Sequence, residues 1–396
     1  MSAAAAASIP LWASVPTAYA APAAKASRRK SEEEVFELIG RRAQEVMARD
    51  KLPGMSVGVM RGGKLVYARA FGVKSVATGA RYTTQSVQGM QSTSKNFAAT
   101  AIMQLVEAGK MNVDRPLVEY LPYFKLHDPR YPRITIRQIL AHRSGLPFIT
   151  PKEMADGENG EFLHPWFDAG AAERYVRSLD DPAWPIDLLA EPGAPDFNYS
   201  DLGYDILADV IHKVSGELFE DYCRRHLFEP LGMKQTTFLP KQVPPGRLVS
   251  PHVLDASGKP VVSKVYPYAR QHAPSSCLHS NVPDMSRWVA MNLNHGSLGR
   301  ARILSPSSQA QLWTPLGDWP FSPNSSAGWG CTIHNELAGA RTIGLYGGFL
   351  VQTSVEIQPS RGLTAMAFTN RDSSSDMPDW ATGDVCNYAL EQMAAL

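Results

Sequence analysis

Two places in the chain carry a serine three residues before a lysine, Ser27 with Lys30 and Ser92 with Lys95. A serine hydroxyl is a weak nucleophile until an adjacent base takes its proton. A lysine amine can be that base when burial or nearby positive charge lowers its pKa. Three residues are close to one helical turn, so on a helix both side chains project from the same face. The spacing therefore indicates serine acylation chemistry if a helix follows the serine.

The two matches differ in their surroundings. Ser27 lies in a polar tail around which neither a helix nor a cleft is predicted. Ser92 precedes apolar residues that recur every three and four positions, which predicts a helix over 93–108 that ends at Gly109. A helix N-terminus supplies partial positive charge and free N–H groups that can hold an oxyanion. On this motif alone, an N-cap serine followed by a solvated lysine remains the simpler interpretation, so the choice depends on the rest of the chain.

Strand patterns lie near both ends of the chain. A capping box at Ser31 and Glu34 opens a predicted helix to about Arg49, and strand-like runs follow at 55–60 and 64–73, joined by a hairpin turn. Toward the other end, three strand-like runs form a predicted antiparallel meander, and a last helix follows them. These elements are predicted at 342–346, 350–358, 362–370 and 380–394.

The middle of the chain is mostly helical in pattern, with helices predicted after residues 198–201 up to Gly216, over 219–228 and over 284–294. Residues 148–197 are predicted to be a long loop, and 239–275 a loop with short extended pieces. We therefore predict an α+β fold: an antiparallel sheet built from both ends of the chain and flanked by the terminal helices, plus an inserted, mostly helical lobe. Residues 31–90 and 280–396 would form the sheet lobe, 91–279 the helical lobe, and 1–30 a leader or disordered tail. Small-molecule sites tend to form between lobes, so we expect the active site there.

Composition argues against several classes of function. Thirty-nine basic residues against 38 acidic ones give a net charge of +1, which provides no field to attract nucleic acid. The four cysteines are far apart and the ten histidines form no metal-binding motif, so we expect free, buried thiols, no metal and no cofactor. Outside the N-terminal tail, no segment approaches the roughly 20 apolar residues that span a bilayer, so stable membrane insertion is not expected.

The alanine-rich start of the chain allows two interpretations. It ends in Ala18-Tyr19-Ala20, a small-x-small pattern typical of leader-peptide cleavage sites. However, no Lys or Arg precedes its apolar stretch, and Pro10 and Pro16 interrupt it. The alternative is a disordered Ala/Pro tail. We expect a periplasmic or secreted protein, with a cytoplasmic one as the alternative.

Several short segments, in a fixed order, give the Ser92 match its context. The chain resembles the serine β-lactamase and penicillin-binding-protein superfamily over roughly residues 35–395. The nearest branch contains the class C β-lactamases with their related esterases (family VIII carboxylesterases) and D-amino-acid peptidases. The resemblance rests on Ser92-Thr93-Ser94-Lys95, residues 105–110, residues 134–147, Tyr199-Ser200-Asp201, Ser215-Gly216, residues 230–233 and the pair Gly347-Gly348.

The resemblance implies the catalytic roles. Ser92 matches the nucleophile, Lys95 its partner, and Tyr199 the tyrosine of a Tyr-x-Asn element, which takes the serine proton and later protonates the leaving group. Asp201 stands where many relatives have Asn. A carboxylate beside Lys95 would raise the pKa of that lysine, which favours Tyr199 over Lys95 as the general base.

The family's Lys-Thr-Gly element is matched by Tyr346-Gly347-Gly348, at the end of one predicted strand and the turn into the next. The resemblance implies that the N–H of Phe349 joins that of Ser92 in the oxyanion hole.

A tyrosine at position 346 replaces the cation that binds a substrate carboxylate in relatives, and a neutral hydrogen bond is about half as strong as a charge-assisted one. Anionic substrates would therefore bind weakly unless Arg341, Arg361 or Arg371 compensates, whereas neutral esters would lose nothing.

Two further features have alternative interpretations. His142 could act as a base, but the resemblance favours a packed or capping histidine. Trp166, Phe167 and Trp184 in the long loop could line a substrate pocket or anchor the loop to the core, and the sequence does not choose between these.

We expect a serine hydrolase that acts through a Ser92 acyl-enzyme on carboxylic esters or small amides. The alternatives with the same nucleophile are a β-lactamase, a D-amino-acid peptidase or an acyltransferase. The unusual residues Asp201 and Tyr346 also leave room for a catalytically silent binding relative. The expected partner is a small-molecule ester, amide or lactam, and the sequence leaves the oligomeric state open.

Overall fold

The structure is a computed structural model of the 396-residue chain, and it describes residues 29–158, 168–322, 324–372 and 380–396. The predicted leader or tail, apart from its last two residues, lies outside the described residues. Among the described residues, no helix is both long and apolar enough to cross a membrane. The four cysteines are buried and unpaired, as predicted.

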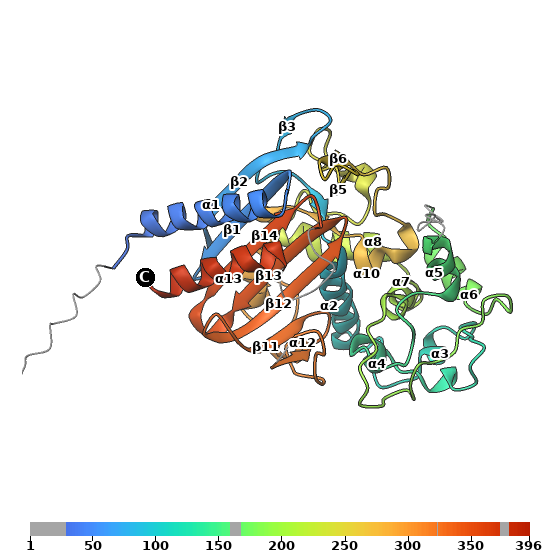
Figure 1. The fold of residues 1–396 in the computed structure, drawn as a ribbon. Coiled ribbons are helices and arrows are strands. Elements are labelled where there is room, and N and C mark those ends of the chain that lie inside the picture. Colours follow the sequence, from blue (N-terminus) through green and yellow to red (C-terminus); the bar gives the residue numbers. More distant parts are fainter. Residues whose placement is uncertain (1–28, 159–167, 323, 373–379) are drawn as a thin grey trace, which may run out of the picture.

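An eight-stranded antiparallel sheet unites the two ends of the chain (Figure 1). The pairing that joins the two ends of the chain is that of β1 (Gly54–Arg61) with β14 (Leu363–Thr369), with Met55 opposite Thr369. The sheet order is β10-β11-β12-β13-β14-β1-β2-β3. The other strands are β2 (Lys64–Ser75), β3 (Ala80–Arg81), β10 (Ser325–Ala327), β11 (Thr332–Leu337), β12 (Ala340–Phe349) and β13 (Val351–Gln358).

The predicted hairpin and meander are confirmed, but β3, β10 and β11 were missed, and one boundary was wrong. Gly347 and Gly348 lie within β12 rather than in the turn that follows it. The residue between β12 and β13 is Leu350, with a φ of 59°. Two successive glycines suggested a turn, but here they allow a strand to approach another element closely.

Two helices cover one face of the sheet: α1 (Glu32–Arg49) and α13 (Ala381–Ala394), from opposite ends of the chain (Figure 1). The predicted capping box is present, because Ser31 Oγ accepts from the Glu34 N–H and the Glu34 carboxylate accepts from the Ser31 N–H. Arg42 joins the two helices through two hydrogen bonds to Asp384, of 2.8 and 2.9 Å. Beneath them, apolar side chains of α1, α13, β1 and β14 form a closed core.

The opposite face of the sheet packs on α2 (Ser94–Glu107) and α11 (Val282–Leu293). Ser92 is not the N-cap of α2, because it lies in a preceding 3₁₀ turn, η1 (Gln91–Thr93). Trp288 of α11 stacks on Phe97 of α2 with ring centroids 3.9 Å apart. Its indole N–H donates to Asn96 Oδ1 at 3.0 Å. This contact fixes the depth at which α2 enters the core.

Further helices lie beyond α2, on the side away from α1 and α13 (Figure 1). The predicted helix at 219–228 is divided into α8 and a π turn. The short extended pieces predicted within 239–275 are present as β5 and β6, whereas the helices within 148–197 were not predicted. The division into lobes at residues 90 and 280 stays a prediction.

The remaining elements are β4 (Gln88–Gly89), α3 (Leu117–Tyr120), η2 (Tyr131–Arg133), α4 (Ile136–Leu140), α5 (Pro151–Glu158), α6 (Ala171–Ser178), α7 (Asp201–Ser215), α8 (Phe219–Cys223), η3 (Arg224–Phe228), α9 (Glu229–Leu231), η4 (Pro240–Gln242), β5 (His252–Leu254), β6 (Pro260–Val262), η5 (Arg270–His272), α10 (Ala273–Ser276), β7 (His279–Ser280), β8 (Ser297–Leu298), β9 (Ala301–Arg302), α12 (Pro306–Leu312) and η6 (Pro359–Arg361).

Removing the indole between α2 and α11 should destabilise the protein strongly. Trp288→Ala leaves a cavity against Phe97 and an unpaired Asn96 amide oxygen, so we expect the free energy of unfolding to fall by about 3–5 kcal/mol. Chemical denaturation followed by circular dichroism measures this change. Trp184→Ala is the control, since Trp184 is 37% exposed, and its loss should cost less than about 1 kcal/mol. Equal losses for the two variants would contradict the central role of the contact.

A buried carboxyl lies between the sheet and α13. Glu356 of β13 is 1% exposed, and its Oε1 accepts from the Tyr346 hydroxyl at 3.5 Å. Burial raises the pKa of Glu356 to about 8, against the smaller lowering effect of that hydrogen bond. The folded protein therefore holds a proton here that the unfolded chain releases near the ordinary value of 4.5.

Stability should consequently fall as the pH rises from about 5 to 8, because over that window the unfolded state binds fewer protons than the folded state. Glu356→Gln keeps the neutral shape at every pH. We expect its Tm to change little relative to wild type at pH 5 and to exceed the wild-type Tm increasingly toward pH 9. Scanning fluorimetry from pH 5 to 9 measures the difference, with Glu336→Gln at an exposed position of β11 as the matched control. A Tm difference that does not depend on pH would contradict the prediction.

Candidate active site

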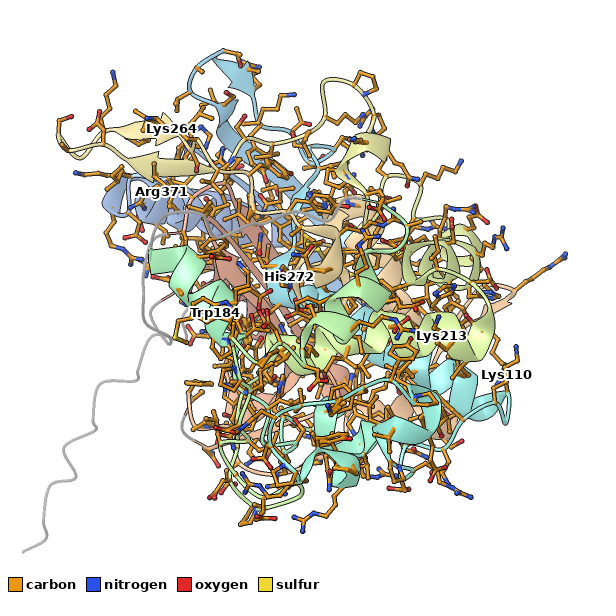
Figure 2. All side chains as sticks on the ribbon, turned by 90° about the vertical axis from the view of Figure 1, so that its right-hand side faces the viewer. Lys110, Trp184, Lys213, Lys264, His272 and Arg371 are labelled. Atoms are coloured by element: carbon orange, nitrogen blue, oxygen red, sulfur yellow. The ribbon has the colours of Figure 1, made fainter. Side chains whose placement is uncertain are left out.

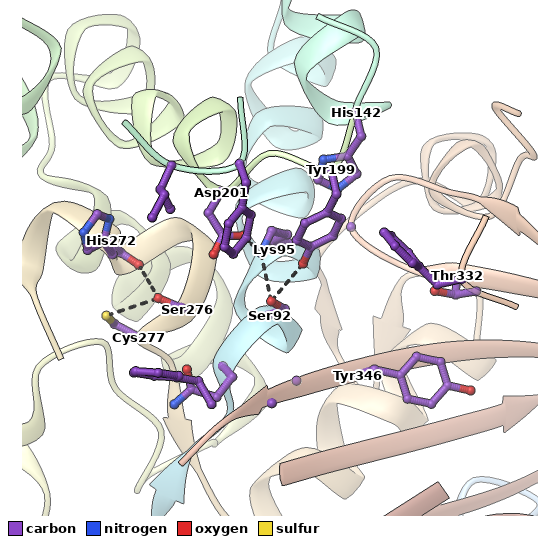
Figure 3. Close-up of a pocket in the computed structure, with 18 of the residues that line it drawn as sticks. Ser92, Lys95, His142, Tyr199, Asp201, His272, Ser276, Cys277, Thr332 and Tyr346 are labelled. Carbon is purple, nitrogen blue, oxygen red and sulfur yellow. Dashed lines mark hydrogen bonds and ion pairs between the residues drawn. The ribbon is translucent and has the colours of Figure 1, made fainter. Parts of the chain in front are cut away.

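Ser92 lies in the η1 turn, where the chain passes from β4 into α2. Gln91 before it has a φ of 49°, a left-handed conformation that is unfavourable for a residue with a side chain. The turn is fixed from the sheet, because Thr353 Oγ1 donates to the Met90 carbonyl at 3.1 Å. One turn further on, the Lys95 Nζ is 3.0 Å from Ser92 Oγ, as the three-residue spacing requires (Figure 3).

Tyr199 reaches the same hydroxyl from a distant part of the chain. It lies just before α7, where Ser200 caps the helix by accepting the Gly203 N–H at 2.9 Å. The Tyr199 hydroxyl donates to Ser92 Oγ at 2.8 Å. The structure thus brings both the Lys95 amine and the Tyr199 hydroxyl within hydrogen-bond distance of Ser92 Oγ (Figure 3).

His142 supports Tyr199 from behind. Its ring stacks on the tyrosine ring at 4.4 Å, and its Nδ1 accepts the Ser200 N–H at 3.1 Å. Burial, with the Lys95 charge as a second cause, holds the pKa of His142 well below the ordinary value, so the ring is neutral and can accept this bond. The expectation of a packed or capping histidine is confirmed by these contacts.

The Lys95 ammonium group is 2% exposed and contacts three acceptors. Besides Ser92 Oγ, Nζ donates to the Ser275 carbonyl at 3.0 Å and pairs with Asp201 Oδ1 at 2.6 Å. Burial, the largest single effect, would lower the pKa of Lys95, but the charges and hydrogen bonds of Asp201 and Tyr199 together outweigh it and leave the pKa above its ordinary value. Burial raises the pKa of Tyr199, although the neighbouring Lys95 charge works against this. At neutral pH, therefore, the resting site holds a lysine cation and a neutral phenol.

The β12 edge approaches the nucleophile closely at Gly347. A Cβ at this position would lie 2.3 Å from the Met90 carbonyl oxygen and 2.9 Å from the Ser92 nitrogen, so only glycine fits. Pairing of β11 with β12 ends at Gly344, and the residues after it border the cavity. Gly348 and Phe349 are among those cavity residues. The role of the Phe349 N–H in the oxyanion hole stays a prediction.

Tyr346 points to the other face of the sheet. Neighbouring residues in a strand face opposite ways, so once Gly347 faces Ser92, Tyr346 faces α13. Its hydroxyl lies 2.9 Å from His334 Nε2 and is directed away from Ser92, although the ring borders the cavity (Figure 3). Burial lowers the pKa of His334 to about 4, so this partner is neutral at pH 7.

The arginines that could replace the missing cation are used elsewhere. Arg341, Arg361 and Arg371 donate to the carbonyls of Trp313, Ala338 and Asp50 at 2.8, 2.8 and 2.9 Å. None of the three belongs to the described lining of the cavity.

A second charged cluster, which sequence reasoning missed, lies at the other side of Ser92. His272 Nδ1 is 2.7 Å from Asp205 Oδ2, and its Nε2 is 3.1 Å from Glu153 Oε1. Burial, the largest single effect, would lower the pKa of His272, but the charges and hydrogen bonds of Asp205 and Glu153 together outweigh it and raise the pKa well above the ordinary value. In Figure 2, His272 lies near the middle of the molecule, whereas Lys110, Lys213 and Lys264 lie toward its outline.

Only part of this cluster left a signal in the sequence. Asp205 follows Asp201 by one helical turn, a spacing that could have been noticed. Glu153 lies in the short helix α5 and His272 in the turn η5, and neither residue belongs to a recognisable sequence motif. Because His272 directly precedes α10, its bond to Asp205 also holds the Ser275 carbonyl against Lys95.

These groups surround a cavity of about 930 Å³. Next to Tyr199, four aromatic side chains form what we call the aromatic wall: Phe148, Phe197, Trp319 and Phe321. Sequence reasoning missed this wall as well. Trp184 is not part of the described lining, and Trp166 and Phe167 lie outside the described residues. The described residues contain no group of three His, Cys, Asp or Glu side chains placed to hold a metal ion.

The beta-lactamase family model matches residues 39–385 of the chain. Among curated proteins, penicillin-binding protein 4 of Amycolatopsis lactamdurans is 28% identical over 327 residues, which cover 81% of each sequence. Protein flp of Staphylococcus aureus strain MW2 is 26% identical over 283 residues, 70% of this chain and 52% of flp. The chain thus spans about half the length of that relative.

Solved structures agree with this result. The octameric penicillin-binding protein homologue from Pyrococcus abyssi superposes with a TM-score of 0.76 at 25% identity, over 90% of this chain and 77% of that one. A penicillin-binding protein from Bacillus halodurans, 21% identical, has the same fold with a TM-score of 0.68, over 89% of this chain and 98% of its own. With the predicted α+β fold confirmed and the family model spanning nearly the whole described chain, the protein belongs to the beta-lactamase family of serine hydrolases.

Proposed function

We propose that the protein hydrolyses neutral carboxylic esters or small amides through an acyl-enzyme on Ser92. One observation carries the proposal: Ser92 Oγ accepts hydrogen bonds from both Lys95 Nζ, at 3.0 Å, and the Tyr199 hydroxyl, at 2.8 Å, beside an open cavity. A nucleophile in contact with two proton-carrying groups is the arrangement that covalent catalysis requires.

Lys95 and Tyr199 act as a coupled pair in this mechanism. The reactive form is the one in which the pair has lost one proton, which leaves a Tyr199 phenolate beside the Lys95 cation. The phenolate takes the Ser92 proton as Oγ bonds to the substrate carbonyl carbon. It then gives that proton to the leaving oxygen as the carbon–oxygen bond breaks. In deacylation, the Tyr199 phenolate takes a proton from water as the water oxygen bonds to the acyl carbon. Tyr199 then gives this proton to Ser92 Oγ as the bond between Oγ and the acyl carbon breaks.

The negative charge that develops on the carbonyl oxygen needs fixed donors. We assign this role to the N–H groups of Ser92 and Phe349, and the close approach of Gly347 to the Ser92 nitrogen supports that assignment. Preorganised backbone donors of this kind supply a large part of the rate in acyl transfer.

The charges around the cavity favour a neutral substrate. The two cationic side chains of the described lining, Lys95 and His272, are already paired with carboxylates. The Tyr346 hydroxyl is bonded to His334. A substrate carboxylate would find no free cation among these groups, whereas an ester needs none. This argument favours the esterase branch of the family.

The alternatives keep the same nucleophile. A β-lactam or a D-amino-acid peptide could be the acyl donor, which the resemblance to penicillin-binding protein 4 supports, or an alcohol or amine could replace water as the acceptor. A catalytically silent binding relative is the remaining alternative. The Ala18-Tyr19-Ala20 pattern favours a periplasmic or secreted location, which also stays a proposal.

Replacing the nucleophile tests the proposal directly. In Ser92→Ala, turnover of p-nitrophenyl butyrate should fall by about 10³-fold or more, because the residues of such a site act as a unit. A fluorophosphonate probe should label the wild type and not the variant. Faster hydrolysis of a chromogenic cephalosporin than of the ester would favour the β-lactamase alternative. Absence of Ser92-dependent labelling and turnover would favour the silent relative.

Removing the carboxylate beside Lys95 tests the proton pathway. Asp201 raises the pKa of Lys95 and also contributes to the raised pKa of Tyr199, so Asp201→Asn should make the pair lose its proton more easily. We expect the ascending limb of kcat/KM against pH to move to lower pH by about 1–2 units. Asp201→Glu keeps the charge and should leave the limb near its wild-type position. A limb that stays in place in Asp201→Asn would argue against the Lys95–Tyr199 pair as the group that titrates.

A further inference from the structure

The proposed function leaves open which ester the cavity accepts. We propose that the aromatic wall is a subsite for the alcohol half of the substrate, so that the enzyme acts on esters of bulky apolar alcohols. This inference rests on the proposed function, and it adds to it the substrate class and the side of the ester that determines selectivity.

The four rings of the wall gather around Tyr199. Their centroids lie 5.9 to 6.4 Å from that of Tyr199, with Trp319 and Phe321 edge-on to it at interplanar angles of 89° and 83°. The rings also contact one another, with Phe197 and Trp319 5.0 Å apart. The wall is therefore continuous with the tyrosine that touches the nucleophile.

Three separate segments supply the wall. Phe148 comes from the loop before α5, Phe197 from the residues before α7, and Trp319 and Phe321 from the segment between α12 and β10. The Phe148 carbonyl accepts the N–H groups of Asp201 and Leu202, at 2.9 and 3.0 Å, which ties this ring to the start of α7. Convergence of distant segments shows that tertiary packing, rather than one apolar stretch of sequence, forms the wall.

The wall keeps apolar surface accessible. Phe148 is 47% exposed, Phe321 is 48% exposed, and the neighbouring cavity residue Leu189 is 66% exposed. Contiguous exposed apolar patches are uncommon on soluble proteins and usually mark binding sites. Aromatic rings at a cavity mouth offer a ligand large contact area and specific edge-to-face geometry.

The direction of proton transfer identifies which half of the ester meets the wall. The leaving oxygen must approach the Tyr199 hydroxyl to receive its proton, so the group attached to that oxygen begins beside the tyrosine ring and continues along the wall. The oxyanion turns toward the β12 edge. The acyl group then occupies the other side of Ser92, where His272 and Ser276 lie (Figure 3). That side carries the charged His272–Glu153 pair and suits a small acyl group.

A series of acetate esters tests the assignment. Ethyl, cyclohexylmethyl and 2-phenylethyl acetate share one acyl group and have alcohols of similar acidity, so differences in kcat/KM report binding of the alcohol rather than chemistry. We expect the wild type to prefer 2-phenylethyl over ethyl acetate by on the order of 10- to 100-fold. This ratio should fall by about 10-fold in Trp319→Ala and in Phe321→Ala. Trp184→Ala, outside the described cavity lining, should keep the wild-type ratio.

A second series separates the two halves of the substrate. Ethyl acetate, ethyl butyrate and ethyl 3-phenylpropionate vary only the acyl group, and their relative kcat/KM values should be the same in wild type, Trp319→Ala and Phe321→Ala. If the variants change selectivity for the acyl group and not for the alcohol, the wall is an acyl site and the inference is wrong. An unchanged alcohol ratio in both variants would overturn it as well.

A binding measurement keeps the inference testable without turnover. In Ser92→Ala, 2-phenylethanol should change the tryptophan fluorescence in a saturable manner, and its affinity should exceed that of ethanol. Adding Phe321→Ala to Ser92→Ala should lower the affinity for 2-phenylethanol. Saturable binding without ester turnover in the wild type would reject the proposed function and leave the apolar subsite standing. Ser92-dependent turnover without such binding, together with an unchanged ratio, would reject the subsite alone.

Discussion

The charge on Lys95 is the constraint around which this site is built. An ammonium group that is 2% exposed is stable only if its donors are satisfied, and its three acceptors come from η1, α7 and α10. Among these acceptors, Asp201 contributes most to the raised pKa of Lys95, which is the reason we propose Tyr199 rather than Lys95 as the proton carrier. Pairing of this one buried cation thus holds Ser92, Asp201 and Ser275 together from three separate elements.

The sheet supplies the other half of the site through close approach. Gly347 allows the β12 edge to reach the Ser92 nitrogen, and Thr353 of β13 holds the Met90 carbonyl just before the turn. Because β14 pairs with β13 on one side and with β1 on the other, the strands from the two ends of the chain form one continuous sheet with β12. The site therefore depends on the complete sheet rather than on α2 alone.

The cavity has two chemically different ends. Paired charges, with His272 between Asp205 and Glu153, occupy one side of Ser92, and the aromatic wall occupies the side of Tyr199. Because those charges are already paired, they add polarity without offering a free cation to a substrate. A substrate that matches both ends would carry a small polar acyl part and a larger apolar alcohol.

The sequence by itself determined what depends on local periodicity: the helix that begins just after Ser92 and carries Lys95 in its first turn, the strands at both chain ends, and, with the help of ordered family segments, the candidate role of Tyr199. Strand alternation could also have shown that Tyr346 and Gly347 face opposite sides of the sheet. Which of the two faces Ser92 is determined only by the tertiary structure. Only the folded structure brought Glu153, Asp205 and His272 together, and only it assembled the aromatic wall. Those contacts join segments more than 50 residues apart, and no repeat of 2 or 3.6 residues relates side chains over such a separation.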